Sequence, residues 1–427
     1  MCEYQMECDD MTYSLRCLYS GDTVTDEYTL VHHQEGLLRA VYPGGKLSVR
    51  EHMDGIWRYA DWLPVSGPSN LVAGTISYKS ENLAAELGLS NLWITYHGYW
   101  PERGGLCPTA SFKDLEAVAT LQRLCDHECK GMVCASAGNT GRSFTFFGGE
   151  EDFPILVIIA ERHLTRIWVP ENHPTDSVTI IGIGDDAGYN DAINVANEVA
   201  EKLGWQIEGG ARNIARRDGI GSLIIDASVN IGRLPDHYFQ AVGGGPGPIG
   251  VHEMAVRAHE SGTFAGPIPK QHLSQNIEHC PIHNAWQAKR NYLLAEDFTD
   301  SATPVFSDYL VNTSPAYSVK GGIFDVLTES NGLTWIVTGA EGLAAAKLFE
   351  ETEGIDIMTP GAVALASLKK AVGSGDVGVD DCVVLNISGG GEKRLFRDVQ
   401  TTIIHPEMIV PKEQAVEAII DFLSTKE

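Results

Sequence analysis

The stretch VCASAGNTGR, residues 133–142, shows how the chain is built. Val133–Ala135 is short and apolar, as a strand buried in a sheet would be, and the residues after it are small and polar. A helix is expected to begin near Arg142. Free backbone N–H groups at such a helix start can bind an anion, for example a substrate carboxylate. A plain β-α turn has the same composition, so this stretch alone leaves both interpretations open.

The same alternation of strands and helices runs through most of the chain. Ile155–Ala160 is wholly apolar, which favours a strand buried on both faces, and Asn190–Leu203 has the spacing of an amphipathic helix. Further strands are expected at Val178–Gly182, Ser222–Asp226, Tyr238–Val242, Trp335–Thr338 and Cys382–Ile387. Further helices are expected at Asp114–Cys129, Val251–Glu260, Ala340–Thr352, Pro360–Val372 and Gln414–Leu423. The pattern predicts an α/β protein with mostly parallel sheets, and 427 residues are enough for two lobes.

Lys113 stands in the segment SFKD, residues 111–114, where a loop meets the first of these helices. The positive end of a helix lowers the pKa of an ammonium group and so favours the neutral amine that a Schiff base needs. A lysine considered alone is more simply a solvated surface residue. The segment therefore indicates a cofactor lysine only when it is considered together with the other segments described here.

Two glycine-rich segments follow expected strands. GGGPGPIG, residues 243–250, lies between a strand and a helix, as a phosphate-binding loop does. Its Gly245, Gly247 and Gly250 also match the dinucleotide spacing G-x-G-x-x-G, but no acidic residue stands on a following strand to bind a ribose. A second partial match, Gly182–Asp186, ends in two carboxylates that would repel a pyrophosphate.

The segment NISGGG, residues 386–391, places Ser388 at the end of a strand, before three glycines. A hydroxyl in that position can approach a planar ring closely, although a glycine-rich turn has the same composition.

Along the chain, SFKD is followed by SAGNTG, then by the glycine loop and then by the strand-end Ser388. This series resembles the fold-type II pyridoxal-phosphate enzymes. More closely, the chain resembles the cysteate synthase family, threonine-synthase-like enzymes of coenzyme M biosynthesis in methanogens. The closer resemblance is carried by GYWPER (98–103), ARNIARRDG (211–219) and GRLPDHYFQAV (232–242), and it extends from Thr75 to Arg397.

The resemblance implies a tryptophan synthase beta-like fold of two three-layer αβα lobes, with pyridoxal 5'-phosphate between them. The large cofactor-binding lobe is expected at residues 71–115 and 246–427, and the smaller lobe at residues 116–245. Residues 1–70 are expected to form an N-terminal appendage.

The resemblance also implies the roles of individual residues. Lys113 is the Schiff-base lysine and the base at Cα, Asn139 binds the ring hydroxyl oxygen, and Ser388 contacts the pyridine nitrogen. The cofactor phosphate is expected at Gly243, Gly244, Gly245 and Gly247, although Pro246 removes one N–H donor from that loop. Substrate contacts are expected from Ser136, Gly138, Thr140 and Arg142.

The reaction implied is a β-replacement, in which O-phospho-L-serine and sulfite become L-cysteate and phosphate through an aminoacrylate intermediate. Both reactants are anions, so a basic pocket is needed, and the candidate cations are Arg142, Lys270, Arg394, Arg216 and Arg217. Threonine synthase, acting on O-phosphohomoserine and water, is the nearest alternative. A nucleotide-binding oxidoreductase and a non-catalytic paralogue are more distant ones.

The composition restricts the partners. The formal net charge is −26, from 31 Lys and Arg against 57 Asp and Glu, which disfavours a nucleic-acid or membrane partner on electrostatic grounds. The acidic N-terminus does not look like a signal peptide, and no apolar run is long enough to cross a bilayer. The expectation is a cytoplasmic enzyme acting on small anions, and a homo-oligomer as its relatives commonly are.

The nine cysteines are scattered, which is typical of a reduced protein. Cys2, Cys8 and Cys17 precede His32 and His33, but they do not have the spacing of a zinc knuckle. Free thiols and no metal are therefore expected in this section. The alternating stretches Thr12–Arg16 and Glu27–Val31 predict a small hairpin there.

Overall fold

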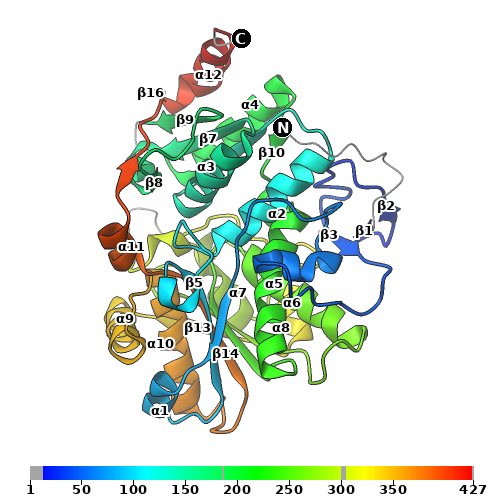
Figure 1. Ribbon diagram of the computed structural model, residues 1–427, viewed down its shortest axis with the longest axis vertical. Helices are drawn as coiled ribbons and strands as arrows, with labels where there is room; N and C mark the ends of the chain where they lie inside the picture. Colours follow the sequence, from blue (N-terminus) through cyan, green and yellow to red (C-terminus); the bar gives the residue numbers. More distant parts are fainter. Residues whose placement is uncertain (1–12, 185–186, 300–303, 426–427) are drawn as a thin grey trace.

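The computed structural model describes residues 13–184, 187–299 and 304–425. Cys2, Cys8 and the Asp185–Asp186 pair therefore lie outside the described residues. The chain forms two α/β lobes, one above the other in Figure 1, and the fold class predicted from the sequence is confirmed.

The larger lobe is built on a six-stranded sheet in the order β13-β12-β11-β14-β5-β4. All neighbouring strands in it are parallel except the edge pair β4 and β5, which is antiparallel. The strands are β4 (Ile76–Lys79), β5 (Leu92–Gly98), β11 (His237–Ala241), β12 (Lys270–Asn276), β13 (Leu333–Val337) and β14 (Val383–Gly390).

Helices cover both faces of this sheet, as a parallel sheet requires. One face is covered by α10 (Thr359–Ser374), with α9 (Gly339–Glu353) and α1 (Asn82–Leu87) outside it. The helices on the other face are α5 (Ile214–Ile231), α6 (Pro246–Glu260) and α8 (Ile323–Glu329). The short helix α7 (Pro281–Gln287) packs on β12 and β13 near the sheet edge.

The smaller lobe is built on a five-stranded parallel sheet in the order β10-β6-β7-β9-β16. Its strands are β6 (Met132–Ser136), β7 (Ile155–Ala160), β9 (Val178–Ile183), β10 (Gln206–Ile207) and β16 (Met408–Val410). Its helices are α3 (Asn139–Glu151) on one face, and α4 (Tyr189–Leu203) with α12 (Ala415–Ser424) on the other. The six residues of β7 are all buried, which explains why this strand was predicted with its correct bounds.

One helix, α2 (Lys113–Asp126), joins the lobes. It packs on α3 of the smaller lobe and on α5 of the larger one. Leu115, Leu121, Phe144 and Ile220 belong to a single buried cluster that includes residues of both lobes. The first residue of α2 is therefore held by packing from two directions.

The sheets differ from the predicted lobe boundaries at two places. The segment from α5 to β11 belongs to the larger lobe, because α5 covers the large sheet and β11 pairs with β12 and β14 in it, although residues 116–245 were assigned to the smaller lobe. Conversely, β16 and α12 belong to the smaller lobe although residues 246–427 were assigned to the larger one, because β16 pairs with β9 and α12 packs on α4. The connecting strand β15 (Thr401–Ile403) pairs with β8 (Trp168–Pro170), and α11 (Glu392–Asp398) precedes it. Strand pairing across distant segments of the chain decides these memberships, and no local sequence pattern reports it.

Two predicted strands were wrong. Ser222–Asp226 lies inside α5, where every residue from Ile214 to Ser228 is buried, so the apolar run belongs to a buried helix. The second arm of the N-terminal hairpin was also misplaced. β1 (Ser14–Cys17) pairs with β2 (Thr23–Val24) and β3 (Leu38–Val41), and Glu27–Val31 is not a strand.

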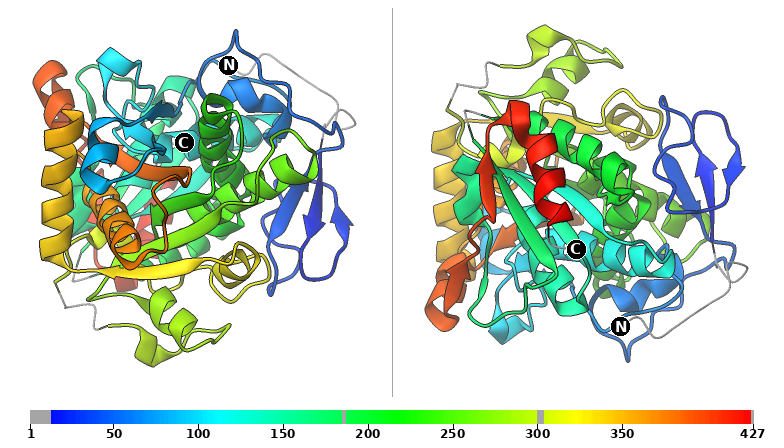
Figure 2. Two further views of the ribbon diagram at one scale, coloured as in Figure 1. Left: turned by 90° about the horizontal axis from the view of Figure 1, so that it is seen from below. Right: turned by 90° about the horizontal axis from the view of Figure 1, so that it is seen from above.

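The three N-terminal strands form a separate small sheet at the side of the molecule, drawn in blue in both views of Figure 2. In the described part of the chain, no helix is long and apolar enough to cross a membrane.

Candidate active site

A cavity of about 900 Å³ lies where the carboxyl ends of strands from both large sheets meet. Ala135 is near the end of β6, Ala241 ends β11, and Ser388 is near the end of β14; all three line this cavity. Ligands bind at this edge in parallel α/β sheets, because loops and helix starts converge there. The cavity therefore stands where the four sequence segments were expected to meet.

Lys113 is the first residue of α2 and lies on the cavity wall. The loop before it is fixed to the end of β14 by backbone hydrogen bonds, because Phe112 N donates to Ser388 O at 3.0 Å and Gly390 N donates to Ala110 O at 3.1 Å. These bonds bring Lys113 and Ser388 together although 275 positions separate them in the sequence. The side chain of Lys113 is 16% exposed.

The surroundings of Lys113 change its acidity. Burial lowers the pKa of the ammonium group, and the nearby Arg216 guanidinium lowers it further. Glu116 opposes this shift, since its Oε2 lies 3.1 Å from Lys113 Nζ. The direction predicted from the helix start is thus present, but its main causes are burial and Arg216, which no local motif revealed.

Asn139 begins α3 and also lines the cavity. Its Oδ1 accepts a hydrogen bond from Arg142 at 3.1 Å, and this orients the amide nitrogen in the other direction. The partner of that nitrogen is the Met358 sulfur at 3.9 Å, which is a weak acceptor. The amide N–H groups can therefore serve an oxygen atom of a ligand in the cavity.

The loop from Gly243 to Gly247 closes another side of the cavity and leads into α6. A Cβ on Gly245 would come within 2.6 Å of Ile323, and a Cβ on Gly247 would overlap the Gln240 amide, so the loop packs too closely for side chains. Its backbone N–H groups and the helix start form an anion site of the kind that holds a phosphate. Pro246 is the first residue of α6, where an N–H has no partner within the helix, so it costs the site little.

The dinucleotide interpretation of this loop loses its support in the structure. Gly250 is inside α6, away from the cavity wall, and its Cα packs against the backbone of Arg217 on α5. The glycine at this position permits two helices to approach each other. It is not part of a ligand-binding turn.

These features fit pyridoxal phosphate. The cavity offers an amine at Lys113, a phosphate cradle at Gly243–Gly247, amide donors at Asn139 and a neutral hydroxyl at Ser388. The donor set matches the aldehyde, phosphate, ring hydroxyl and ring nitrogen of that cofactor in chemical type.

The four residues expected to contact substrate are divided between the wall and the layer behind it. Gly138 and Thr140 line the cavity, whereas Ser136 and Arg142 are not on its wall. Ser136 Oγ accepts hydrogen bonds from Gly138 N at 3.0 Å and from Gly141 N at 2.7 Å, and so shapes the loop before α3. Their contacts with substrate stay a prediction.

Arg142 is fully buried behind Asn139. Its guanidinium stacks over the Trp168 ring at 4.4 Å and lies 3.6 Å from Glu392. Burial lowers its pKa. In this position Arg142 orients Asn139 and does not line the cavity itself.

The remaining candidate cations are mostly elsewhere. Arg394 is paired with Asp398 and Glu102 on the surface, and Arg217 is buried against Glu253. Lys270 begins β12 and is not on the cavity wall. Only Arg216 of these candidates lines the cavity, where its Nη1 lies 2.6 Å from Glu208 and its Nε lies 2.9 Å from Glu116.

Sequence reasoning missed Arg212, which also lines the cavity. Its Nη2 donates to the Gln34 carbonyl at 2.8 Å, and its Nη1 is buried with no hydrogen-bond partner among the described residues. Burial lowers the pKa of Arg212. No motif marks this residue, although it stands in the segment 211–219 that carried the closer family resemblance.

Residues of the N-terminal section, which was predicted to be an appendage, also line the cavity. Part of it forms a side of the cavity, which we call the N-terminal wall: Leu30, Val31, Gln34 and Leu37. The wall is tied to the larger lobe, because Leu37 N donates to Lys320 O at 3.0 Å and Lys320 N donates to Glu35 O at 2.7 Å. The section is therefore more than an appendage.

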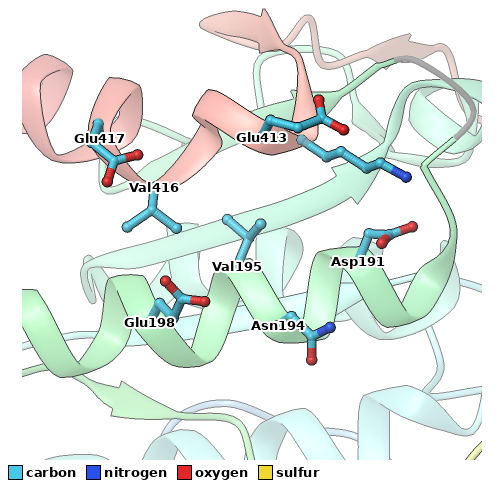
Figure 3. Close-up of a pocket in the computed structure, with 8 residues that line it drawn as sticks. Asp191, Asn194, Val195, Glu198, Glu413, Val416 and Glu417 are labelled. Carbon is cyan, nitrogen blue, oxygen red and sulfur yellow. The ribbon is translucent and has the colours of Figure 1, made fainter.

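A smaller hollow of about 360 Å³ lies between α4 and α12, far along the chain from Lys113. Figure 3 shows Val195 and Val416 facing each other across it, with Asp191, Glu198, Glu413 and Glu417 around them. Four carboxylates and one ammonium group, that of Lys412, line this hollow, so it is a poor site for an anion. It carries none of the segments that predicted chemistry.

Solved structures show the same fold. A serine racemase from maize matches with a TM-score of 0.56 and 17% identity, covering 76% of this chain and 91% of that one. A variant of O-ureido-L-serine synthase matches with a TM-score of 0.57 and 12% identity, covering 82% of this chain and 97% of that one. At such identities the likeness concerns the fold.

The family described as pyridoxal-phosphate dependent enzyme matches residues 69–389, and the fold and cavity agree with that class. Two curated relatives, both named cysteate synthase, are 45% identical to the chain. The protein from Methanosarcina acetivorans covers 93% of this chain and 96% of its own length, and that from Methanosarcina barkeri covers 92% and 95%. The chain therefore belongs to the pyridoxal-phosphate dependent enzymes and, within them, to the cysteate synthase family.

Proposed function

We propose that the chain converts O-phospho-L-serine and sulfite into L-cysteate and phosphate. The observation that carries this proposal is the cavity itself, which brings Lys113, Asn139, the Gly243–Gly247 loop and Ser388 together. The cysteate synthase relatives, 45% identical over nearly the whole chain, support the choice of reaction.

Each of these four features of the cavity has a part in the proposed reaction. When bound, pyridoxal phosphate supplies an electron sink for the carbanion at Cα. Lys113 would hold the cofactor, and its Nζ would take the Cα proton of the substrate. The Asn139 amide would donate a hydrogen bond to the hydroxyl oxygen of the cofactor ring and so orient the ring. The Gly243–Gly247 loop would hold the cofactor phosphate. Ser388 leaves the ring nitrogen unprotonated, because a neutral hydroxyl is a poor acid, and this favours elimination and replacement.

The exchange at Cβ is balanced without an oxidant. Phosphate leaves with the electron pair of its Cβ–O bond, and sulfite supplies the pair for the new Cβ–S bond. The proton that Lys113 removed from Cα returns to Cα at the end. Lys113 therefore needs to hold one proton through the whole exchange, on a side chain that is 16% exposed.

The charge of the cavity wall favours anionic reactants. Three cations, Lys113, Arg212 and Arg216, and a single carboxylate, Glu208, are on the wall among the described residues. Arg216 is already paired with Glu208 and Glu116, whereas Arg212 has no carboxylate partner in the described part of the chain. We therefore assign to Arg212 the contact with the phosphate or sulfite oxyanion.

The decisive experiment supplies the purified holoenzyme with O-phosphoserine and sulfite, and separately with O-phosphohomoserine alone. We expect cysteate and phosphate in the first mixture and no threonine in the second, measured by mass spectrometry and phosphate release. Threonine from the second mixture, without cysteate in the first, would replace this proposal by threonine synthase activity. A homo-oligomer in the cytoplasm stays a prediction, which sedimentation analysis tests in its oligomeric part.

A further inference from the structure

A buried carboxylate, Glu116, stands one turn after Lys113 on α2 and has no role in the reaction described above. Its side chain is 0% exposed. Oε2 lies 3.1 Å from Lys113 Nζ and 2.9 Å from Arg216 Nε, and Oε1 accepts a hydrogen bond from the Thr140 hydroxyl at 3.2 Å. Both oxygens are thus engaged by groups on three different helices, so the carboxylate is held in one place.

The contacts of Glu116 join three residues of the cavity wall that come from three helices. Lys113 is the expected cofactor lysine on α2, Thr140 follows Asn139 in the first turn of α3, and Arg216 is on α5. Buried charges are tolerated where they are paired, and removal of one partner leaves the other at a high cost. The free energy of the buried Glu116 carboxylate therefore depends on whether Lys113 is charged or neutral.

The groups that face this site come from every element packed around it. Their charges nearly balance, since two cations alternate with two carboxylates along the line from Lys113 to Glu208. The titratable and charged groups are Lys113 and Glu116 on α2, Arg216 on α5, Glu208 after β10, Tyr189 on α4 and Cys134 on β6.

We propose that Glu116 is a positioning residue that fixes the Lys113 amine beside the cofactor and stabilises the positive charge on that amine while it holds the Cα proton. The proposal rests on the proposed function for the identity of the proton. In the exchange, Nζ takes the proton with its lone pair and becomes an ammonium ion, and Glu116 Oε2 is then its ion-pair partner. When the proton returns to Cα, the amine is neutral again and keeps a hydrogen bond to the same oxygen.

Glu116 also reduces the repulsion between Lys113 and Arg216. Arg216 and Lys113 share Oε2, so the carboxylate separates two positive groups that would otherwise repel each other. Without it, Lys113 would face the Arg216 guanidinium alone, and its neutral form would be favoured more strongly. The amine would then release the Cα proton too readily to solvent or to a neighbouring group.

The experiment measures the acidity of Lys113 in the cofactor-free protein. Amines are labelled with trace acetic anhydride across a pH series, and the peptide that contains Lys113 is quantified by mass spectrometry, with the 76%-exposed Lys347 as an internal reference. In wild type, we expect Lys113 to become reactive at lower pH than Lys347, because burial and Arg216 lower its pKa. In Glu116→Gln, we expect the transition to move lower still, by about one pH unit or more.

Two variants make the outcome specific. Arg216→Gln removes a cation, so the Lys113 transition should move to higher pH, opposite to Glu116→Gln. Glu253→Gln is the matched control, because Glu253 is a buried carboxylate paired with Arg217 and Arg39 outside the cavity, and it should leave Lys113 as in wild type. The proposal is overturned if Glu116→Gln leaves the Lys113 transition unchanged or raises it. If that variant does not fold, Glu116→Asp takes its place: it keeps the charge but withdraws it from Lys113 Nζ, so the transition should again move to lower pH, and an unmoved transition in Glu116→Asp overturns the proposal equally.

A second readout uses the loaded enzyme. The acidic limb of the kcat profile for cysteate formation should move to lower pH in Glu116→Gln, since it reports the deprotonation of Lys113, whereas a purely structural role would lower kcat at every pH. Labelling of the cofactor-free protein does not depend on substrate. Failure of the proposed reaction would therefore leave the labelling result intact, and the two hypotheses fail separately.

Discussion

The two sides of the cavity are built in different ways. The cofactor side, formed by Lys113, Asn139, Gly243–Gly247 and Ser388, consists of short segments that each follow a strand end or begin a helix. The N-terminal side, formed by the N-terminal wall and Arg212, consists of irregular chain and a short 3-10 helix (Gly210–Arg212). Backbone hydrogen bonds and one from the Arg212 side chain to the Gln34 carbonyl hold it. The cofactor side needs close backbone approach and a fixed amine, whereas the other side needs a cation and apolar contact. The first requirement leaves a sequence motif, and the second does not.

The comparison assigns different tasks to the two sides. The cofactor side should control whether chemistry occurs at all, because every step depends on the amine and the electron sink. The N-terminal side should control which anion is accepted and how tightly. Variants on the two sides should therefore differ in whether they change the chemical step or the affinity for substrate.

Lys113→Ala is the largest test on the cofactor side. In the proposed reaction the amine is both the link to the cofactor and the base at Cα, so its removal should reduce turnover by at least about a thousandfold. Cysteate formation measures the loss, and borohydride treatment should no longer attach cofactor to the peptide that contains residue 113. Lys347→Ala, at an exposed lysine, should retain both properties. Normal turnover in Lys113→Ala would remove the basis of the whole assignment.

The convergence of Lys113, Asn139, Gly243–Gly247 and Ser388 on one cavity was foreseeable, because each stands at a strand end or a helix start. Each of these motifs is contained in a short segment: a lysine at a helix start, a glycine loop, or a hydroxyl at a strand end. Each can therefore be identified without knowledge of how distant segments pack. Arg216 and its contact with Glu116 could not be found in this way. Arg216 reaches Lys113 through the packing of α2 on α5, which depends on contacts between segments far apart in the chain.

Arg212→Gln is the corresponding test on the opposite side. The loss of a charged hydrogen bond to the oxyanion should reduce kcat/KM by about 10- to 100-fold, mainly through KM, with the visible spectrum of the bound cofactor unchanged. Steady-state kinetics with phosphoserine and sulfite varied in turn shows which of the two depends on the guanidinium. Arg397→Gln, an exposed arginine on α11, is the control. An unchanged KM for both reactants would remove Arg212 from the substrate site.

Most of the fold was predictable, and the two strands that were predicted wrongly have physical causes. Buried parallel strands such as β7 consist of apolar residues only, so composition identifies them. The same composition misled at Ser222–Asp226, because α5 is buried on all sides and its apolar run has no helical periodicity. The N-terminal sheet was only half predicted, because its register depends on long-range pairing with β3.

Gly247→Ala should have a smaller effect, confined to cofactor binding. The new methyl group would overlap the Gln240 amide, which cannot turn away freely because its Oε1 accepts a hydrogen bond from the Tyr238 hydroxyl at 2.6 Å. The start of α6 must then shift, and the affinity for pyridoxal phosphate should fall by about 10-fold. Spectroscopic titration of the cofactor-free protein measures this. Gly373→Ala, inside α10 with open space around it, should leave the affinity unchanged and stabilise the helix by up to about 1 kcal/mol.

His97 offers the smallest effect on turnover at neutral pH, although it lies beneath the cofactor side. It is fully buried in β5, where Nε2 contacts the Thr75 hydroxyl at 2.9 Å, Nδ1 contacts the Ile387 carbonyl at 3.1 Å, and the ring packs on Phe112. Burial lowers the pKa of His97 to about 4. The side chain is therefore neutral throughout the working range and acts as a scaffold for the Lys113 loop.

The pH dependence of stability tests this role. Because the unfolded state takes up a proton near pH 6.5 and the folded state only near pH 4, His97 should reduce the free energy of unfolding progressively over that interval, by about 3 kcal/mol at pH 4. His97→Gln lacks the titrating group, so it should lose correspondingly less stability between pH 7 and pH 4, as measured by urea denaturation at each pH. The exposed His405→Gln is the control and should follow wild type. If His97→Gln lost as much stability on acidification as wild type, the pKa of His97 would have to be the same in the folded and unfolded states, and its burial in β5 would not control its protonation.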